Sequence, residues 1–235
     1  MERYKRHLSI ENFDSRKQEK IKNAKVLIAG LGGLGSFVLY NLASIGILNL
    51  GLVEFDKVDI TNFNRQIIYN FSDLGKEKIA RAKENILKFN PDLKIETFNK
   101  KLDEDNVDEI IKNYDIIIDC LDNYKGKFLL NDSCLKFDKT LIFGGVEEFS
   151  GQIAVIDKKS ACLRCIFPDF DLNKPVKKGI ISPVVSEIAS IQAMEAFKII
   201  TNDKNILYNT LLTIDFKKTE YKKLSLAKNK LCTLH

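Results

Sequence analysis

The fold of this chain is decided by VLIAGLGGLGS, residues 26–36, in which an apolar run leads directly into a glycine loop. Gly30, Gly32 and Gly35 match the G-x-G-x-x-G spacing, and Gly33 lies within the same loop. Glycines at this spacing allow a tight turn, a close approach of the backbone to phosphate, and close packing of the next helix on the strand. The N-terminus of that helix offers unpaired N–H groups to an anion. The stretch therefore predicts a nucleotide site at the end of a β-strand.

The glycine loop alone is weakly specific, because dehydrogenases, methyltransferases and flavoproteins carry it too. Glu54 ends the next strand-like run, close to the offset of about 20 residues at which an acidic side chain accepts hydrogen bonds from a ribose. Asp56 follows shortly after it. A dinucleotide enzyme needs little further positive charge, because the helix end already holds the pyrophosphate. This chain instead brings Arg65 and Lys78 toward the same edge, which indicates a triphosphate that is split.

The first part of the chain alternates between strand-like and helix-like segments. We expect strands at 25–30, 50–54, 93–98, 114–120 and 140–145, and helices at 34–46, 75–89, 103–112 and 124–137. Such alternation is typical of βαβ units, in which a mostly parallel sheet carries helices on both faces. The sequence therefore predicts a Rossmann-like α/β fold.

After Gly145 the pattern changes. We expect a strand at 151–157, an irregular loop at 166–182, a long helix at 184–201, and two antiparallel closing strands near 206–215 and 218–224. No internal repeat or low-complexity linker divides the chain. We therefore expect residues 1–235 to form a single domain, with a nucleotide-binding core at about 24–145 and a second part at about 146–235.

The composition is that of an ordinary globular protein, with 235 residues, 45% of them hydrophobic and 29% charged. No apolar run reaches the roughly 18 to 20 residues of a membrane span, and residues 1–7 are charged where a signal peptide turns apolar, so we expect a cytoplasmic protein without a membrane partner. The net charge of +5 comes from 37 basic and 32 acidic residues mixed along the chain. The pI of about 8.8 falls below the value of about 9 or more, with clustered Lys and Arg, that is typical of nucleic-acid binding, so we expect no nucleic-acid partner.

An ordered series of motifs resembles the ThiF/MoeB/HesA family of adenylyltransferases, the bacterial relatives of ubiquitin-activating enzymes. The motifs are GLGGLGS at 30–36, Asn62-x-x-Arg65-Gln66, Lys78 after Gly75, CLDN at 120–123, Gly151-Gln152, CLRC at 162–165 and QAMEA at 192–196. The resemblance implies ATP- and Mg²⁺-dependent adenylation of the C-terminal glycine of a small ubiquitin-like sulfur carrier protein ending in Gly-Gly. The pathway it implies is thiamine or molybdopterin biosynthesis, and the part at about 146–235 is then expected to bind the carrier and zinc.

The resemblance also implies roles for individual residues. Arg65 and Lys78 match the family's catalytic phosphate-binding positions, while Asn62 and Gln66 line the same site. Cations there stabilise the charge that builds on the β- and γ-phosphates. The alternative is that the two cations are solvated surface charges.

Asp122 follows a buried-looking strand, at the edge of an open α/β sheet where ligands bind. An oxygen ligand there suits Mg²⁺ bridging phosphates, and the family places its metal-binding aspartate at this position. Asp119 is the competing candidate, although we expect it to accept hydrogen bonds from the loop backbone instead.

Arg3-Tyr4-Lys5-Arg6 resembles the family's Arg-Tyr-x-Arg segment. The resemblance implies that Arg6 reaches the ATP phosphates of a second subunit as an arginine finger in trans, so that the active unit is a homodimer. The alternative is a solvated terminal tail.

Two close pairs of ligand-type residues predict a metal site. Cys162 and Cys165 form a CxxC, and Cys232 and His235 form a CxxH. Four N/S ligands in two pairs fit a tetrahedral structural zinc, whereas the alternative is two unrelated pairs, one of them a redox CxxC. Relatives usually supply four cysteines, so His235 is a departure from the family pattern.

The loop before the long helix departs from the family as well. Many relatives carry a cysteine there that joins covalently to the carrier, but the loop at 173–183, which includes Pro175, has none. Cys120 and Cys134 are expected to be buried apolar residues. Two alternatives to carrier adenylation stay open at the sequence level: a non-catalytic or NAD-binding Rossmann protein, and adenylation of a different peptide C-terminus.

Overall fold

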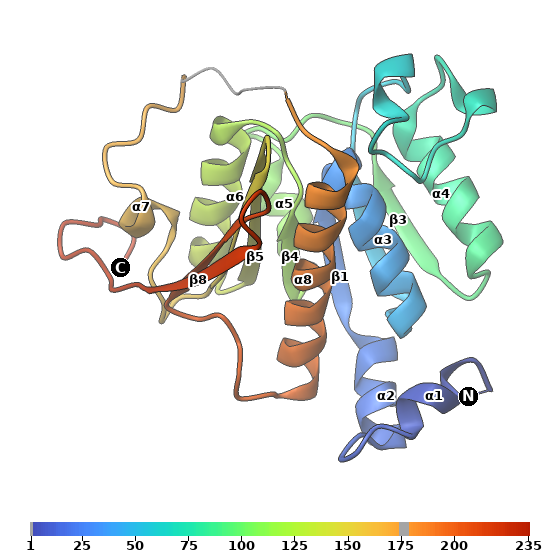
Figure 1. The fold of residues 1–235 in the computed structure, drawn as a ribbon, viewed down its shortest axis with the longest axis horizontal. Helices are drawn as coiled ribbons and strands as arrows, with labels where there is room; N and C mark the ends of the chain where they lie inside the picture. The colour runs from blue at the N-terminus through green and yellow to red at the C-terminus, as the bar shows by residue number, and fades with distance from the viewer. Residues whose placement is uncertain (1, 174–178) are drawn as a thin grey trace.

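One eight-stranded sheet organises the computed structural model, which describes residues 2–173 and 179–235 (Figure 1). The strands run in the order β3 (Lys94–Phe98), β2 (Asn49–Val53), β1 (Lys25–Ala29), β4 (Ile116–Asp119), β5 (Thr140–Glu147), β6 (Ser150–Ile156), β7 (Thr210–Asp215) and β8 (Glu220–Ser225). The pairs from β3 to β5 are parallel, and the pairs from β5 to β8 are antiparallel. The predicted Rossmann-like fold, with antiparallel strands toward the C-terminus, is confirmed.

The central strands are continuously apolar because both of their faces are covered. Every residue of β4 and all but the first of β1 are buried. In register, Val26 of β1 lies between Leu50 of β2 and Ile116 of β4. A central parallel strand has no solvated face, so its sequence forms an apolar run in place of an alternating pattern.

Helices cover the two faces of the sheet and form two cores. One core contains apolar side chains of α2 (Ser15–Asn23), α3 (Gly33–Ile45), α4 (Lys78–Phe89) and α8 (Ser182–Thr201). The other contains side chains of α5 (Val107–Ile111) and α6 (Tyr124–Lys136). The short helices are η1 (Glu2–Tyr4), α1 (Lys5–Leu8), η2 (Ile60–Asn62), η3 (Phe71–Asp73) and α7 (Leu163–Ile166). None of the described helices is both long and apolar enough to cross a lipid bilayer.

The strand order creates a switch point between β1 and β4. From β1 the chain passes outward through β2 to β3 and then returns to β4 on the other side of β1. In open α/β sheets, ligands bind in the crevice outside the carboxyl ends of the strands at such a point. The glycine loop after β1 and the Asp122 loop after β4 both lie at this place.

Two helices begin later than predicted, because other backbone or side-chain hydrogen bonds hold the residues before them. The predicted helix at 75–89 begins only at Lys78, because Glu77 forms a β-bridge with Lys57. The predicted helix at 103–112 begins at Val107, because the Asp103 carboxylate accepts the N–H groups of 105 and 106. Such local side-chain bonds offer the backbone an alternative to the helix.

The N-terminal helices were not predicted from the sequence. The Asp14 side chain caps α2 by accepting the Lys17 N–H. The buried residues of this helix are Gln18 and Ile21. Tyr4 is only 5% exposed, and its ring lies beside Gly46 at the end of α3. The segment around Arg6 is therefore folded onto the domain and is not a solvated tail.

Candidate functional site

The glycine loop is closed by backbone contacts that exclude larger side chains. Gly30 has a φ of +93°, and a Cβ on it would lie 2.8 Å from the carbonyl oxygen of Cys120. A Cβ on Gly35 would lie 2.0 Å from the carbonyl oxygen of Gly30. These two glycines bring β1, β4 and the start of α3 together, as the motif predicts. α3 begins after Gly32 without a side-chain cap, so its first N–H groups face the crevice without a capping side chain.

The space beside Gly32 is different, because it is open except for one side chain. Of the side chains in the described residues, a Cβ on Gly32 would meet the Gln66 amide alone, with Nε2 at 3.7 Å. Gln66 is 3% exposed, and its Oε1 has no hydrogen-bond partner among the described residues. A buried polar atom without a partner costs roughly 1–3 kcal/mol. The amide can present its oxygen or, turned by 180°, its NH₂ group to a ligand in this space.

The two predicted cations are held in different ways. Arg65 donates from Nη1 to the Thr61 carbonyl oxygen at 2.9 Å, and its side-chain carbons lie beside Gly33. Lys78 begins α4, and its side chain is only 6% exposed. Its ammonium nitrogen lies 3.3 Å from Oδ2 of Asp56, an aspartate whose side chain is half exposed. Lys78 is therefore not a solvated surface charge.

Glu54 links this ion pair to the glycine loop. One of its carboxylate oxygens accepts the Leu31 N–H at 3.0 Å, and the other accepts the N–H groups of Phe55 and Asp56. The Leu31 carbonyl oxygen in turn accepts a hydrogen bond from the Tyr69 hydroxyl at 2.9 Å. Both oxygens of Glu54 thus hold backbone in this structure, and its contact with a ribose stays a prediction. Asp56 has the freer carboxylate.

Asn62 shapes the turn that carries Arg65. Its side chain and that of Asp59 form a capping box around η2, in which Asn62 Oδ1 accepts the Asp59 N–H at 2.9 Å. Hydrogen bonds from Thr61 hold the pKa of Asp59 below its usual value. The predicted role of Asn62 in lining a nucleotide site stays a prediction beside this structural one.

The two aspartates at the end of β4 have separate roles. Asp122 is exposed, and no hydrogen bond or ion pair joins its side chain to another described residue. Asp119 is fully buried and accepts the Leu121 N–H at 3.0 Å, so the predicted bond to the loop backbone is confirmed. Its second oxygen lies 3.1 Å from the ammonium of Lys127, which also donates to the Gly144 carbonyl oxygen.

Lys127 and Gln192 were missed as members of this site. Gln192 is fully buried in α8 and donates to the Asp119 carbonyl oxygen at 2.9 Å, which joins α8 to the end of β4. Burial raises the pKa of Asp119, and the nearby Lys127 opposes this shift. Gln192 is the first residue of the QAMEA motif at 192–196, which is a signal in the sequence, whereas no motif pointed to Lys127.

Arg6 lies far from the other predicted site residues of its own chain. It belongs to α1, which packs at the amino ends of the strands, whereas the glycine loop follows the carboxyl end of β1 (Figure 1). Its side chain is exposed. The structure therefore does not join Arg6 to the site within one chain.

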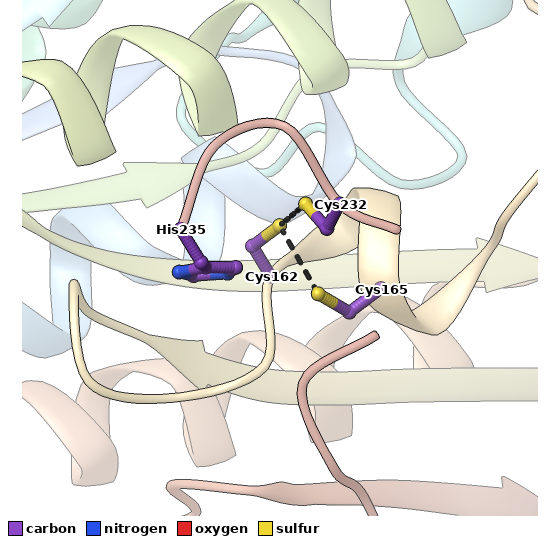
Figure 2. Close-up of side chains that lie close together, drawn as sticks. All are labelled: Cys162, Cys165, Cys232 and His235. Atoms are coloured by element: carbon purple, nitrogen blue, oxygen red, sulfur yellow. Dashed lines mark hydrogen bonds between the residues drawn. The ribbon is translucent and has the colours of Figure 1, made fainter. Parts of the chain in front are cut away.

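The four predicted metal ligands are brought together from two segments. Figure 2 shows Cys162 and Cys165 at α7 facing Cys232 and His235 of the segment after β8. Their ligand atoms all lie within 4.8 Å of one another, and the Cys162 sulfur lies 3.7 Å from each of the other two sulfurs. Two thiolates on a tetrahedral zinc with bonds of about 2.3 Å lie about 3.8 Å apart, whereas a disulfide is about 2.05 Å long. The geometry fits a zinc-type site and excludes a formed redox disulfide. Burial raises the pKa of Cys162 to about 12, so metal binding there displaces a proton.

Cys120 and Cys134 are buried free thiols, as predicted. The observation on the loop at 173–183 cannot be placed in the same way, because residues 174–178, and Pro175 with them, lie outside the described residues.

A pocket of about 450 Å³ lies at the carboxyl ends of the parallel strands. It is lined by residues that follow β2, β3 and β4, among them Phe55, Lys101 and Asn123. A larger groove of about 730 Å³ lies at the amino ends of the strands, between α2 and α8, and contains none of the predicted site residues. The smaller pocket is not lined by predicted site residues either, but its Phe55 and Asn123 are sequence neighbours of Glu54, Asp56 and Asp122.

Comparisons with known proteins agree with this arrangement. The family model described as ThiF family matches residues 4–234. The chain is 35% identical over 238 residues to a probable molybdopterin-synthase adenylyltransferase of Gracilaria tenuistipitata var. liui, which covers 99% of this chain and 67% of the relative. A second relative of the same description, from Porphyra purpurea, is 36% identical, and the chain spans 59% of its length.

A further relative and a solved structure are also similar to the chain. A sulfur carrier protein adenylyltransferase of Thermus thermophilus is 31% identical over 242 residues, which cover 99% of this chain and 89% of the relative. A crystal structure of E. coli MccB with MccA-N7isoASN superimposes with a TM-score of 0.89 at 23% identity, over 99% of this chain and 74% of that one, and this likeness concerns the fold. On the family match and these identities, the chain belongs to the ThiF family.

Proposed function

We propose that this chain is a cytoplasmic adenylyltransferase that uses ATP and Mg²⁺ to activate the C-terminal carboxylate of a small ubiquitin-like sulfur carrier protein ending in Gly-Gly. Pyrophosphate leaves in the reaction. Family membership and the names of the relatives, which are sulfur carrier and molybdopterin-synthase adenylyltransferases, support this activity. Thiamine or molybdopterin biosynthesis is the pathway that such a carrier serves.

The observation that carries the proposal is the open space beside Gly32. The unpartnered Gln66 amide borders it, Arg65 lies against neighbouring Gly33, and Lys78 is joined to the loop through Asp56 and Glu54. A dinucleotide on the same loop has no use for this set of donors. A triphosphate has, because attack on its α-phosphate builds negative charge on the β- and γ-groups, and preorganised donors there stabilise the transition state.

Asp122 is the proposed magnesium ligand. It has an exposed carboxylate at the switch point, next to the loop that contacts Gly30, and no partner among the described residues competes for it. Mg²⁺ prefers such oxygen ligands together with substrate phosphates. No general base is needed, because the carrier's terminal carboxylate has a pKa of about 3.3 to 3.7 and is ionised at neutral pH.

Zinc in the Cys162, Cys165, Cys232 and His235 site is part of the proposal. The distances between these ligand atoms fit a tetrahedral ion, which would tie the segment after β8 to α7. The role proposed for the metal is structural, because a full set of four protein ligands leaves no open coordination position for substrate.

A homodimer is also proposed. Arg6 is exposed and lies at the opposite end of the sheet from the glycine loop, so a role in the reaction requires that it reach the site of a second subunit. Segment 60–74 exposes four large apolar side chains, those of Ile60, Ile67, Phe71 and Leu74. A neighbouring group of exposed apolar residues is typical of a protein interface.

Mass spectrometry of the acceptor tests the reaction. The chain is incubated with a Gly-Gly carrier and ATP labelled on the α-phosphate. We expect the label and the mass of one adenylyl group on the carrier, and neither on a carrier that lacks the final glycine. Label on an unrelated peptide C-terminus but not on the carrier would assign a different acceptor, and label on no acceptor would contradict adenylation.

A further inference from the structure

The phosphate-type residues Arg65 and Gln66 belong to a closed excursion of the chain between β2 and α4. Its two ends are paired: Lys57 bridges Glu77, and the Val58 N–H donates to the Lys76 carbonyl oxygen at 2.8 Å. The excursion has little regular structure beyond η2 and η3. Beyond these paired ends, side-chain contacts hold it against the glycine loop and α4.

One joint fixes the excursion to the glycine loop. Tyr69 is 5% exposed, and its hydroxyl donates to the Leu31 carbonyl oxygen at 2.9 Å. Glu54 holds the N–H of the same residue at 3.0 Å. Burial raises the pKa of Tyr69, so its hydroxyl is a neutral donor at all ordinary pH values. The backbone N–H and C=O of Leu31, the residue directly before Gly32, are thus both hydrogen-bonded to side chains.

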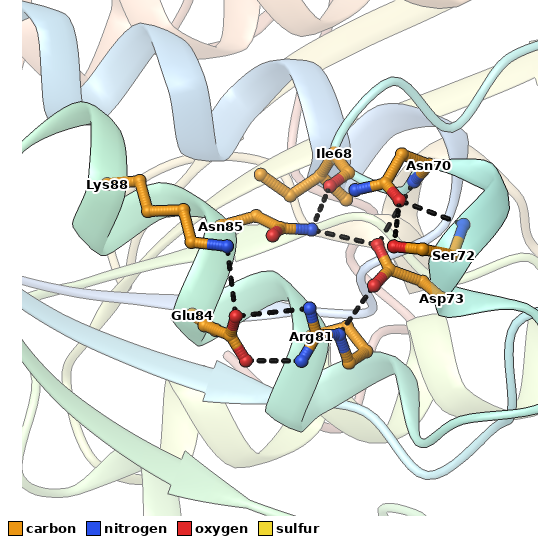
Figure 3. Close-up of polar contacts among 8 residues, drawn as sticks. All are labelled: Ile68, Asn70, Ser72, Asp73, Arg81, Glu84, Asn85 and Lys88. Carbon is orange, nitrogen blue, oxygen red and sulfur yellow. Dashed lines mark hydrogen bonds and ion pairs between the residues drawn. The ribbon is translucent and has the colours of Figure 1, made fainter.

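A second joint fixes the excursion to α4 (Figure 3). Asp73 is fully buried. One of its carboxylate oxygens accepts a hydrogen bond from Arg81 Nε at 2.6 Å, and the other accepts hydrogen bonds from the Asn70 N–H and from Asn85 Nδ2, at 3.0 Å each. Asn85 also donates to the Ile68 carbonyl oxygen at 2.9 Å. These hydrogen bonds outweigh burial and keep the pKa of Asp73 below its usual value, so it is ionised at neutral pH.

The second joint acts directly on the element that carries Lys78. Lys78, Arg81 and Asn85 are spaced i, i+3 and i+7 along α4, so they lie on one face of the helix. Bonds from Asp73 to the latter two contribute to fixing the rotation of the helix about its axis, together with its buried apolar residues. That rotation sets the direction in which Lys78 leaves the first turn. Glu84 pairs with Arg81 from the exposed side and makes no contact with Asp73.

We propose that Tyr69 and Asp73 are positioning residues that hold the glycine loop, the Arg65–Gln66 turn and Lys78 in register for the β- and γ-phosphates of ATP. This rests on the proposed function, in which those groups meet the triphosphate. A network that only stabilised the fold would affect every nucleotide equally. A positioning network affects binding of the β- and γ-phosphates, which ATP has and AMP lacks, so its loss should weaken ATP binding more than AMP binding.

The test is the ratio of ATP to AMP affinity, measured by calorimetry with Mg²⁺ on the full chain. Tyr69→Phe removes one hydroxyl, and Asp73→Asn keeps the shape of the side chain but removes its charge. Each is expected to lower the ATP-to-AMP affinity ratio about threefold to tenfold, the size of one hydrogen-bond contribution, with AMP affinity unchanged. Glu84→Gln is the matched control, because it alters the exposed partner of Arg81 and removes none of the hydrogen bonds that Asp73 accepts. Lys78→Ala is the reference for losing a phosphate contact outright.

The outcomes separate this inference from the proposed function. If Lys78→Ala lowers the ratio while both positioning variants leave it unchanged, or weaken ATP and AMP equally, the positioning role is wrong and the phosphate site stands. If Lys78→Ala itself leaves the ratio unchanged, the triphosphate site is wrong, and the positioning role falls with it. Circular dichroism shows whether a variant unfolds below the assay temperature. If Asp73→Asn unfolds, the test rests on Tyr69→Phe, which is the smaller change.

Discussion

Arg65 and Lys78 differ in how firmly the fold holds them. Among the described residues, Lys78 is buried at the start of a helix with one ion-pair partner, whereas the Arg65 guanidinium is bound to its own turn. A planar guanidinium with five donors can still grip two phosphate oxygens after its turn contacts are made. Arg65 is therefore the more adaptable group and Lys78 the more preorganised one.

Substituting either cation is expected to remove most adenylation. Arg65→Ala and Lys78→Ala should each lower carrier-dependent pyrophosphate exchange on the order of a hundredfold, because each removes one oriented transition-state donor. Lys88→Ala is the control on the same helix, since Lys88 is exposed and pairs with Glu84 alone in the part of the chain that the structure describes. Exchange at near wild-type rates in both Arg65→Ala and Lys78→Ala would contradict their assignment.

At the residue scale, the sequence identified positions better than contacts. Spacing placed Gly30 and Gly35 correctly, because their need for glycine is a local backbone property. It did not identify the Asp119–Lys127 pair, because that ion pair depends on how β4 and α6 pack. Glu54 shows the same limit: its place after β2 was predictable, but its hold on Leu31 depends on the crossover of the chain.

Among the elements, the metal segment gives the clearest prediction. Protein prepared without chelator should contain one zinc per chain, and Cys162→Ser should weaken zinc binding more than His235→Ala. The physical reason is that a thiolate is a charged ligand at the buried centre of the cluster, whereas the imidazole is neutral and exposed. Elemental analysis and competition with a chromogenic chelator measure both quantities. An absence of zinc from the wild-type protein would contradict the site.

The joint between η3 and α4 predicts a pH dependence of stability. The folded-state pKa of Asp73 is lowered by hydrogen bonds from Asn70, Arg81 and Asn85, which together outweigh burial. Its contribution to stability is therefore present above the ordinary pKa of 3.8 and is lost as pH falls through the lower folded-state value. Asp73→Asn should reduce the free energy of unfolding in urea at pH 7, with a smaller difference from wild type near pH 3. An equal difference at both pH values would contradict the ionised joint.

The class of the sheet and the long helices were predictable from the sequence, whereas the short N-terminal helices were not. β1 and β4 form apolar runs bounded by glycine or polar residues, and α8 is long enough to be recognised as a helix from its sequence. By contrast, α2 has only Gln18 and Ile21 buried, so its periodicity is too weak to see. Its helical state comes from an Asp14 cap and from packing on the domain, which sequence spacing does not contain.

The molecule as a whole leaves Arg6 and the glycine loop at opposite ends of the sheet, and this separation predicts complementation between subunits. Mixing inactive Arg6→Ala protein with inactive Lys78→Ala protein should restore activity, because one composite site of the heterodimer keeps both cations. Mixed dimers are detected by a mass tag on one variant. If subunits exchange and no activity returns, Arg6 does not act in trans.

Carrier-dependent exchange of labelled pyrophosphate into ATP tests the central claim most directly, because it reports reversible attack of a carboxylate on the α-phosphate and no later step. Wild-type protein with Mg²⁺ and a Gly-Gly carrier should show exchange that disappears when the carrier, the metal or Lys78 is removed. No exchange with any carrier, or exchange of equal rate in Lys78→Ala, would contradict an adenylation site built on the glycine loop.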